Sequence, residues 1–287
     1  GGAVIAVAIC LSGLALNSSQ LMKNTIKGTS KNSRQTDQAK TTKPTDATNQ
    51  SIATIEKVVR YRLPNNGDGY LHFRFPATAI GTIGEGDDTN GIKAQGDVAV
   101  KAGPNVFFRA MQPVLDNPQL LEGFSRDDLS SLILDQATLG TNLTQNTTKH
   151  IRHLKSLKKI SAPISDFPKE SLADFNELPL LDDLVIDGTS MNGSELAKLK
   201  RLPDMHYLAI SGMSNCAPVL EVLVKKNNLR RLTVEGCRLN DDDMLNIGKL
   251  NKLEGLEASG NSFTDKNLSV LPNLPYLRKL SLSGNPI

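Results

Sequence analysis

Histidines are the first candidates for chemistry in this sequence, because neutral imidazole is a common metal ligand. His150 and His153 are three positions apart and could share one face of a helix. No cysteine or carboxylate stands near them in a spacing that would complete a zinc site. The other two histidines, His72 and His206, are isolated in the sequence. We therefore expect neither a metal ion nor a cofactor.

Motifs for nucleophilic catalysis and phosphate binding are also missing. The sequence has no GxSxG elbow. The stretch GTIGEG (81–86) resembles a nucleotide-binding loop only in its glycines, because it lacks the Lys-Ser/Thr of a P-loop and a following helix pattern. Among the three cysteines, Cys216 and Cys237 form the one conceivable disulfide, the alternative being two small side chains packed separately. The sequence thus predicts a protein that is not an enzyme.

A repeated apolar pattern supplies the elements that position any functional residue. The pattern LxxLxLxx(N/T/C)xL begins at positions 181, 205, 229, 253 and 277, at a constant interval. Weaker copies begin at Leu157, one such interval earlier, and at Leu129, after a slightly longer one. The second half of most units carries apolar residues three apart, as in Leu196, Leu199 and Leu202, which favours one face of a short helix. Each unit is therefore a strand followed by a helix, and the units must stack to bury their apolar sides.

This pattern resembles the leucine-rich-repeat family over residues 129–287. The resemblance implies an α/β solenoid with parallel strands on its concave face and short helices on its convex face. The family's Asn at the ninth position stands only at Asn261 and Asn285, where other units have Ser165, Thr189, Met213 or Cys237. The 24-residue form is similar to that of many bacterial membrane proteins, including receptor-like serine/threonine kinases, although no kinase residues are present in this chain.

Side chains between the strand leucines are expected on the concave face, since successive strand residues alternate in direction. Ten of them are candidates for ligand binding: Asp182, Asp183, His206, Tyr207, Arg230, Arg231, Glu254, Glu257, Arg278 and Lys279. The same face includes Lys158, Lys159 and Ser161. One hypothesis is a self-neutralising ladder of exposed ion pairs, worth little to stability. The other is a binding patch centred on Tyr and Arg, the residue types that most often anchor interfaces.

Residues 51–128 are predicted to form a small mixed β-rich module. The alternation in YLHFRF (70–75) favours a strand, and residues 85–97 are rich in Gly, Asp and Asn, as in a loop. Valines at 98 and 100, and Val106 with Phe108, flank a turn-forming stretch and predict a β-hairpin. A helix is expected to begin at Pro118, because proline suits the first helical position.

The start of the chain predicts contact with a membrane. Residues 1–22 carry no charge and are largely apolar, which favours either a spanning helix or the apolar region of a secretory signal. Residues 23–50 are polar and predict a disordered linker. Residues 17–50 carry four more basic than acidic side chains, out of a net charge of +3, so the remainder is nearly neutral. That balance argues against nucleic acid as a partner.

Two functions fit these observations. One is the non-catalytic, extracytoplasmic recognition module of a membrane-anchored receptor or sensor that binds a protein or other macromolecule. This includes the sensor half of a kinase whose catalytic domain lies upstream. The other is an intracellular interaction scaffold attached to a membrane. Basic residues after the apolar run favour a cytoplasmic side, whereas a cleaved signal and the family resemblance favour the outside. We also expect that the natural chain extends beyond both Gly1 and Ile287, because the last unit has no helical half.

Overall fold

The computed structural model describes residues 60–135, 145–165 and 167–287. The expected apolar segment 1–22 and linker 23–50 lie outside these residues, as do Ala137 and Leu139 of the first repeat. None of the helices within the described ranges is long and apolar enough to span a bilayer.

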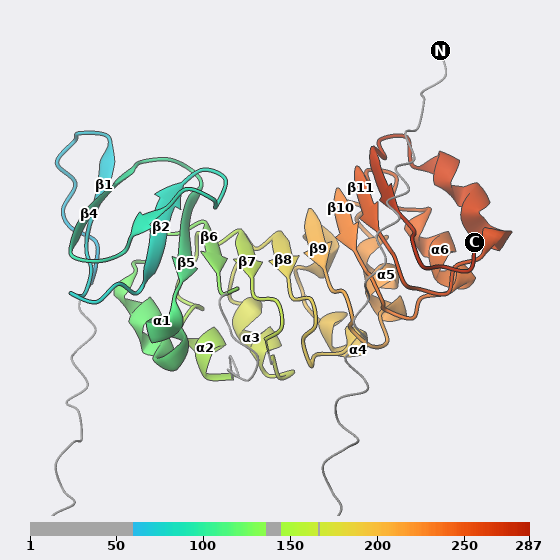
Figure 1. The fold of residues 1–287 in the computed structure, drawn as a ribbon, viewed down its shortest axis with the longest axis horizontal. Helices are drawn as coiled ribbons and strands as arrows, with labels where there is room; N and C mark the ends of the chain where they lie inside the picture. Colours follow the sequence, from blue (N-terminus) through green and yellow to red (C-terminus); the bar gives the residue numbers. More distant parts are fainter. Residues whose placement is uncertain (1–59, 136–144, 166) are drawn as a thin grey trace, which may run out of the picture. The chain divides into compact units, whose positions relative to one another are not determined.

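A ten-stranded sheet organises the described residues, in the order β12-β11-β10-β9-β8-β7-β6-β5-β2-β3. From β5 to β12 every neighbouring pair is parallel. The repeat strands are β6 (Ser131–Ile133), β7 (Lys159–Ser161), β8 (Asp183–Val185), β9 (Tyr207–Ala209), β10 (Arg231–Thr233), β11 (Gly255–Glu257) and β12 (Lys279–Ser281). Their row lies along one side of the unit in Figure 1, and the helices lie along the other.

The helical side consists of short segments. The α-helices are α1 (Gln112–Asp116), α2 (Gln145–Lys149), α3 (Ser171–Phe175), α4 (Gly193–Leu196), α5 (Ala217–Leu223) and α6 (Asp241–Ile247). The 3₁₀ helices are η1 (Pro118–Gly123), η2 (Leu202–Asp204) and η3 (Asp265–Asn273). Pro118 begins a helix as predicted, although the helix is of the 3₁₀ type. The expected leucine-rich-repeat solenoid is confirmed, with a strand followed by one or two short helical segments in each unit from β6 to β11.

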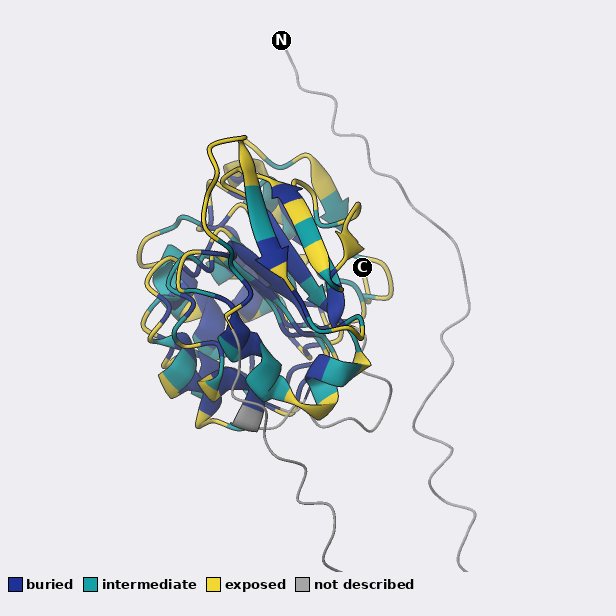
Figure 2. Ribbon diagram, turned by 90° about the vertical axis from the view of Figure 1, so that its left-hand side faces the viewer, coloured by how far each residue is buried: buried dark blue, intermediate teal, exposed yellow. Residues whose placement is uncertain are grey.

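The core lies between the two layers (Figure 2). The central strand leucines Leu184, Leu208, Leu232 and Leu256 are at most 1% exposed. Helix-side residues such as Leu196, Leu199 and Leu202 face them and are equally buried. Neighbouring units register leucine on leucine, for example Leu232 on Leu208 and on Leu256. The apolar periodicity of the sequence therefore translates directly into one continuous core.

Asparagines at the ninth position bond to the backbone of neighbouring turns. Asn261 Nδ2 donates to Val234 O at 2.8 Å, and Asn261 Oδ1 accepts from Leu239 N at 3.0 Å. Cys237 occupies the same position one unit earlier, and its thiol donates to Ile210 O at 3.2 Å. A thiol is thus a partial substitute for the amide.

The turn after each strand needs a left-handed residue. Five units place a glycine there, at positions 188, 212, 236, 260 and 284, with φ between 62° and 73°. The unit of β7 has Ile164 instead, with φ 57° and 59% of its surface exposed. A β-branched residue is strained in this region of backbone space. Its side chain nevertheless faces solvent, so no burial offsets that strain.

The N-terminal module continues the same sheet. Its strands are β1 (Tyr70–Arg74), β2 (Gly81–Glu85), β3 (Ile92–Lys93), β4 (Asp97–Lys101) and β5 (Val106–Ala110). β5 pairs with β6 on one side and with β2 on the other, so the sheet crosses residue 128 without a break. The predicted strand at 70–75 is confirmed.

The predicted hairpin between residues 98–100 and 106–108 is wrong. β4 instead pairs antiparallel with β1 in a separate two-stranded sheet, and β5 lies between β2 and β6. The physical reason is the pair Phe107 and Phe108, which are both buried, on opposite faces of β5. A strand with two apolar faces requires cover on both sides, which the middle of the large sheet supplies and an exposed hairpin does not.

Candidate functional site

The strand register places the candidate residues in three rows along the sheet. Asp183, Tyr207, Arg231, Gly255 and Lys279 occupy equivalent positions on β8 to β12. A second row holds Val185, Ala209, Thr233, Glu257 and Ser281. A third row directly precedes the strands and holds Asp182, His206, Arg230, Glu254 and Arg278. Five of the ten sequence-predicted residues therefore occupy outward-facing strand positions, and the other five directly precede those strands.

Several of these charges form pairs between neighbouring units. Arg230 NH1 lies 2.6 Å from Glu254 Oε1, and His206 Nδ1 lies 3.2 Å from Asp182 Oδ2. Lys279 forms an ion pair with Glu257 and has a raised pKa, because Glu257 accepts a hydrogen bond from its ammonium group. Side chains in these pairs are 26–73% exposed, so solvent screens the charges and the pairs contribute little to the stability of the fold.

An aromatic ring marks the middle of the face. The Arg231 guanidinium carbon lies 4.4 Å from the centre of the Tyr207 ring, within cation–π distance. This stack orders two large side chains in advance, which lowers the entropy lost on binding a partner.

Asp183 stands beside Tyr207 in a different environment. Burial raises the pKa of its carboxyl, and the neighbouring Asp182 raises it further, against the opposing effects of Arg231, Lys159 and His206. The ionised carboxylate is therefore solvated less well in the folded chain than in the unfolded one.

A loop covers the N-terminal end of the same face. Phe107 on β5 and Ser131 and Ile133 on β6 occupy face positions, yet they are only 1%, 6% and 2% exposed. The residues between β2 and β3 lie over them. Gly91 of this loop would bring a Cβ within 3.2 Å of the Phe107 ring, and Gly84 of β2, the register partner of Phe107, would bring one within 2.7 Å, so glycine allows both close approaches.

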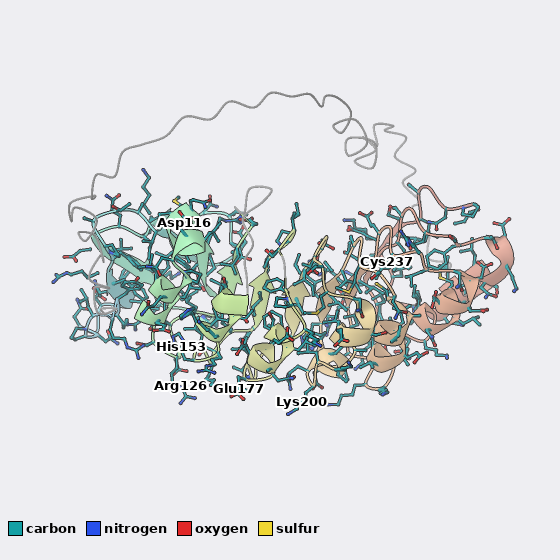
Figure 3. The ribbon with its side chains drawn as sticks, turned by 90° about the horizontal axis from the view of Figure 1, so that it is seen from below. Asp116, Arg126, His153, Glu177, Lys200 and Cys237 are labelled. Atoms are coloured by element: carbon teal, nitrogen blue, oxygen red, sulfur yellow. The ribbon has the colours of Figure 1, made fainter. Side chains whose placement is uncertain are left out.

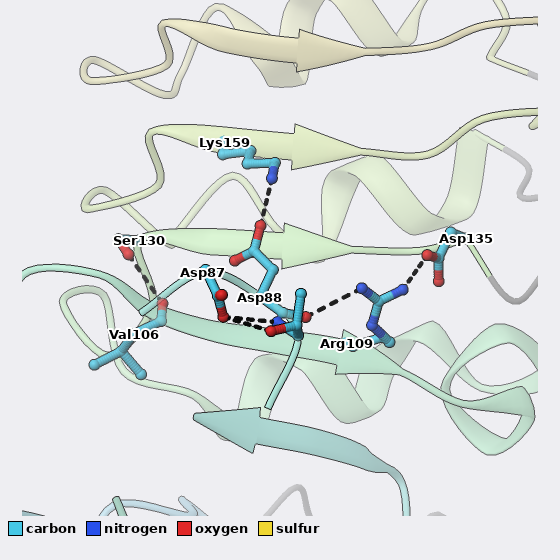
Figure 4. A network of polar contacts seen from close by, with 8 residues as sticks. Asp87, Asp88, Val106, Arg109, Ser130, Asp135 and Lys159 are labelled. Carbon is cyan, nitrogen blue, oxygen red and sulfur yellow. Dashed lines mark hydrogen bonds and ion pairs between the residues drawn. The ribbon is translucent and has the colours of Figure 1, made fainter. Parts of the chain in front are cut away.

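Polar contacts hold this loop on the strands, as Figure 4 shows. The Asp88 carboxylate forms an ion pair with Lys159 of β7, and the Asp88 carbonyl oxygen accepts from Arg109 NH2 at 3.2 Å. Arg109 also forms an ion pair with Asp135. Lys159, which the sequence analysis places on the concave face, is therefore a partner of the covering loop. The loop predicted at 85–97 is confirmed only in part, because β3 (Ile92–Lys93) lies within that range. In the sequence, only the unusual pair Phe107–Phe108 indicated a surface that must be covered.

His150 and His153 lie on the helical side and have structural partners. His150 Nδ1 is 2.6 Å from Glu122 Oε1, and His153 Nε2 is 3.0 Å from Phe124 O. His153 also lines an open cavity of about 450 Å³ with Arg152, Lys155, Ala173, Asp174 and Glu177. His153 and Glu177 are labelled in Figure 3. Within the described ranges no three His, Cys, Asp or Glu side chains form a metal-binding group.

The two described cysteines are free thiols and both are buried. Cys216 donates to Met213 O at 3.2 Å, whereas Cys237 bonds to the preceding turn. The Cys237 thiol and burial together raise the pKa of Cys216, which keeps its thiol protonated. Both cysteines are therefore packed separately within the repeats, which was the alternative to a disulfide.

Comparison with known proteins finds only distant structural similarity. No family model matches the chain. No curated protein matches it either. A solved structure of internalin C2 from Listeria monocytogenes is similar, with 18% sequence identity, a TM-score of 0.43 and coverage of 61% of this chain and 85% of that one. A second Listeria monocytogenes internalin shares 21% identity, with a TM-score of 0.39 and coverage of 59% and 51%. The assignment of the solenoid rests on this chain's own strand register.

Proposed function

We propose that this chain is a non-catalytic recognition module that binds a protein partner on the strand face of β8 to β12, called the open face below. The observation that carries the proposal is the contrast within one sheet. The loop at 86–91 covers β5 and β6, whereas β8, β9, β10 and β12 present Asp183, Tyr207, Arg231 and Lys279 at the positions equivalent to Phe107 and Ser131. Five strands spaced ~4.8 Å apart give a face of roughly 20 Å, which suits a protein surface.

The composition of the open face supports protein as the ligand. Tyr207 and Arg231 are of the types enriched among residues that dominate binding energy. Their stacking supplies a pre-ordered centre. Acidic and basic residues alternate from strand to strand, which does not match the continuous basic field that nucleic acid requires.

The experiment is site-specific photo-crosslinking in the organism's own extract. A photoreactive amino acid replaces Tyr207 in one bait and Glu221, on the helical side, in a control bait. We expect a specific protein adduct from position 207 only. Purified partner should then bind the Tyr207→Ala/Arg231→Ala double variant at least tenfold more weakly. The matched variant Glu221→Ala/Lys225→Ala, changed at exposed residues of α5 and the turn after it, should bind unchanged.

Equal losses in both variants, or adducts from position 221 alone, would move the binding surface to the helical side. The unfolding midpoint of the Glu221→Ala/Lys225→Ala variant should agree with the parent, and that of the Tyr207→Ala/Arg231→Ala variant should fall by no more than about 2–4 °C, the shift that a loss of about 1 kcal/mol gives. That control separates lost contact from lost structure.

Membrane attachment through residues 1–22 and an extracytoplasmic position for the repeats complete the proposal as a receptor or sensor. The support is the uncharged, apolar composition of that segment. Fractionation of cells that express the chain with and without residues 1–22 tests attachment. Protease added to intact cells tests the side on which the repeats lie.

A further inference from the structure

Among the described residues, Asp183 is the one partly buried carboxylate of the open face without a partner, whereas the carboxylate of Glu235 at its margin is exposed. Asp182 pairs with His206, Glu254 with Arg230 and Glu257 with Lys279. Asp187, just after the same strand, accepts from Ser211 N at 2.6 Å. Among the residues that the structure describes, the Asp183 carboxylate has neither a hydrogen bond nor an ion pair, although it is only partly exposed.

The cations around Asp183 are already engaged. Lys159, its register neighbour on β7, is paired with Asp88 of the covering loop. His206 is directed to Asp182, and Arg231 is stacked on Tyr207. The raised pKa of Asp183 follows from this arrangement, because the effects of burial and Asp182 outweigh those of Arg231, Lys159 and His206. Within the described ranges, no side chain or backbone group donates a hydrogen bond to this carboxylate, so it depends on water there.

Resting on the proposed function, we propose that Asp183 is the docking point for a lysine or arginine side chain of the protein partner. A cation there would supply the hydrogen bond that the fold leaves unmade and would benefit from the second acidic charge at Asp182. Val185, in the adjacent row of the same strand, is apolar and partly exposed, so it can contact the methylene stem of such a side chain. An acidic side chain at the same place would meet two carboxylates and be repelled.

The test is an NMR titration of the full chain with Nα-acetyl-lysine methylamide as the probe. Parallel titrations use the norleucine analogue, which is similar in shape and uncharged, and the glutamate analogue, which is anionic. We expect saturable shifts of the amides of Asp183 and Tyr207 with the lysine probe only, with a dissociation constant on the order of 1 mM for a single contact.

Two variants locate the effect. Asp183→Asn keeps the shape and removes the charge, and should weaken lysine binding at least fivefold. Glu235→Gln removes an exposed carboxylate from the margin of the same face and should leave it unchanged. The Asp183→Asn chain should also unfold at no lower temperature than the parent at neutral pH. A raised folded-state pKa means that the ionised group lowers stability once the pH exceeds the group's pKa in the unfolded chain.

The inference is overturned if no saturable lysine binding occurs at these amides. Equal shifts with the norleucine probe, stronger binding of the glutamate probe, or equal losses in both variants overturn it as well. These outcomes are separate from the fate of the proposed function. A partner that requires Tyr207 and Arg231 but is indifferent to Asp183→Asn would leave the open face as the binding surface and remove only its basic anchor.

Discussion

The two ends of the strand face have the same backbone arrangement, but their outward-pointing side chains are buried at one end and exposed to solvent at the other. At the N-terminal end, Phe107, Ser131 and Ile133 point outward from β5 and β6 into a covering loop and are buried. At the other end, β8 to β12 carry Asp183, Tyr207 and Arg231 at equivalent positions, and these remain in contact with solvent. The strand pattern thus sets where a side chain points, while the neighbouring loop decides whether it serves stability or recognition.

The largest loss of stability is expected at the inward-pointing strand leucines, a feature in which the two ends do not differ. Leu232→Asp should unfold the repeats, because Leu232 is 1% exposed and an unpaired buried carboxylate costs several kcal/mol. Its neighbour Thr233 points to the open face, so Thr233→Asp should cost only about 1 kcal/mol, from the lost hydrogen bond to Glu257 and the second carboxylate placed opposite Glu257. Thermal unfolding followed by circular dichroism measures both. Similar midpoints would mean that the strand register is wrong.

A second pair compares aromatic residues at equivalent face positions of the two ends. Phe107→Ala should cost about 3–5 kcal/mol, the usual loss for a buried phenylalanine. Tyr207→Ala removes a partly exposed ring with a single cation–π contact and should cost about 1 kcal/mol. Urea titrations give both values. If the Phe107 variant were as stable as the Tyr207 variant, the loop would not be a cover.

A third comparison concerns one ion pair at each end of the face. Asp88→Asn removes the charge that holds the loop to Lys159 and keeps a residue that tolerates the left-handed φ of 67° at this position. We expect a loss of about 1 kcal/mol and faster proteolysis between residues 86 and 91, because the pair is only 13–32% exposed. Glu254→Gln breaks the more exposed pair with Arg230 and should cost less than about 0.5 kcal/mol. Proteolysis of the loop at the parent's rate in Asp88→Asn would show that Arg109 and the glycine contacts are sufficient.

The smallest effect concerns the turn at the boundary between the two ends. Ile164→Gly gives this unit the residue found at the equivalent position of the five following units and should raise the free energy of unfolding by up to about 1 kcal/mol. The reciprocal change Gly188→Ala, at φ 65°, should lower it by a similar amount. Differential scanning calorimetry resolves both directions. A loss of stability in Ile164→Gly would mean that the isoleucine makes a stabilising contact despite its exposure.

The structure of the repeats could be predicted from the sequence, whereas the loop that covers β5 and β6 could not. The constant repeat interval places Leu208, Leu232 and Leu256 in one buried stack, because local periodicity decides which side of a strand is apolar. The same logic assigned all ten candidate residues to one face, and five of them occupy outward-facing strand positions. Their pairing was also foreseeable for Asp182 with His206 and for Glu254 with Arg230, since these residues are one unit apart.

The cover depends on contacts between residues far apart in the chain. Asp88 meets Lys159 across 71 positions, and no local pattern encodes that meeting. The hairpin prediction failed for the same reason, because the alternation at 98–108 is equally compatible with pairing to β1, β2 or β6. The sequence pattern also does not predict that Asp183 is partly buried and unpartnered, because this depends on the ion pair between Lys159 and the loop.

The uniform offset between units makes the length of the open face adjustable. From β7 through β12, each strand pairs with the next at the same shift along the chain, one repeat unit. Duplication or deletion of one such segment within β8 to β12 would keep an apolar residue stacked on an apolar residue at the central position of each strand. The covered end would stay intact, because Lys159, the repeat residue to which its loop is paired, lies on β7, outside the changed segment. A lineage, or a protein engineer, could therefore lengthen or shorten the recognition surface in steps of ~4.8 Å without redesigning the part of the chain that starts the sheet.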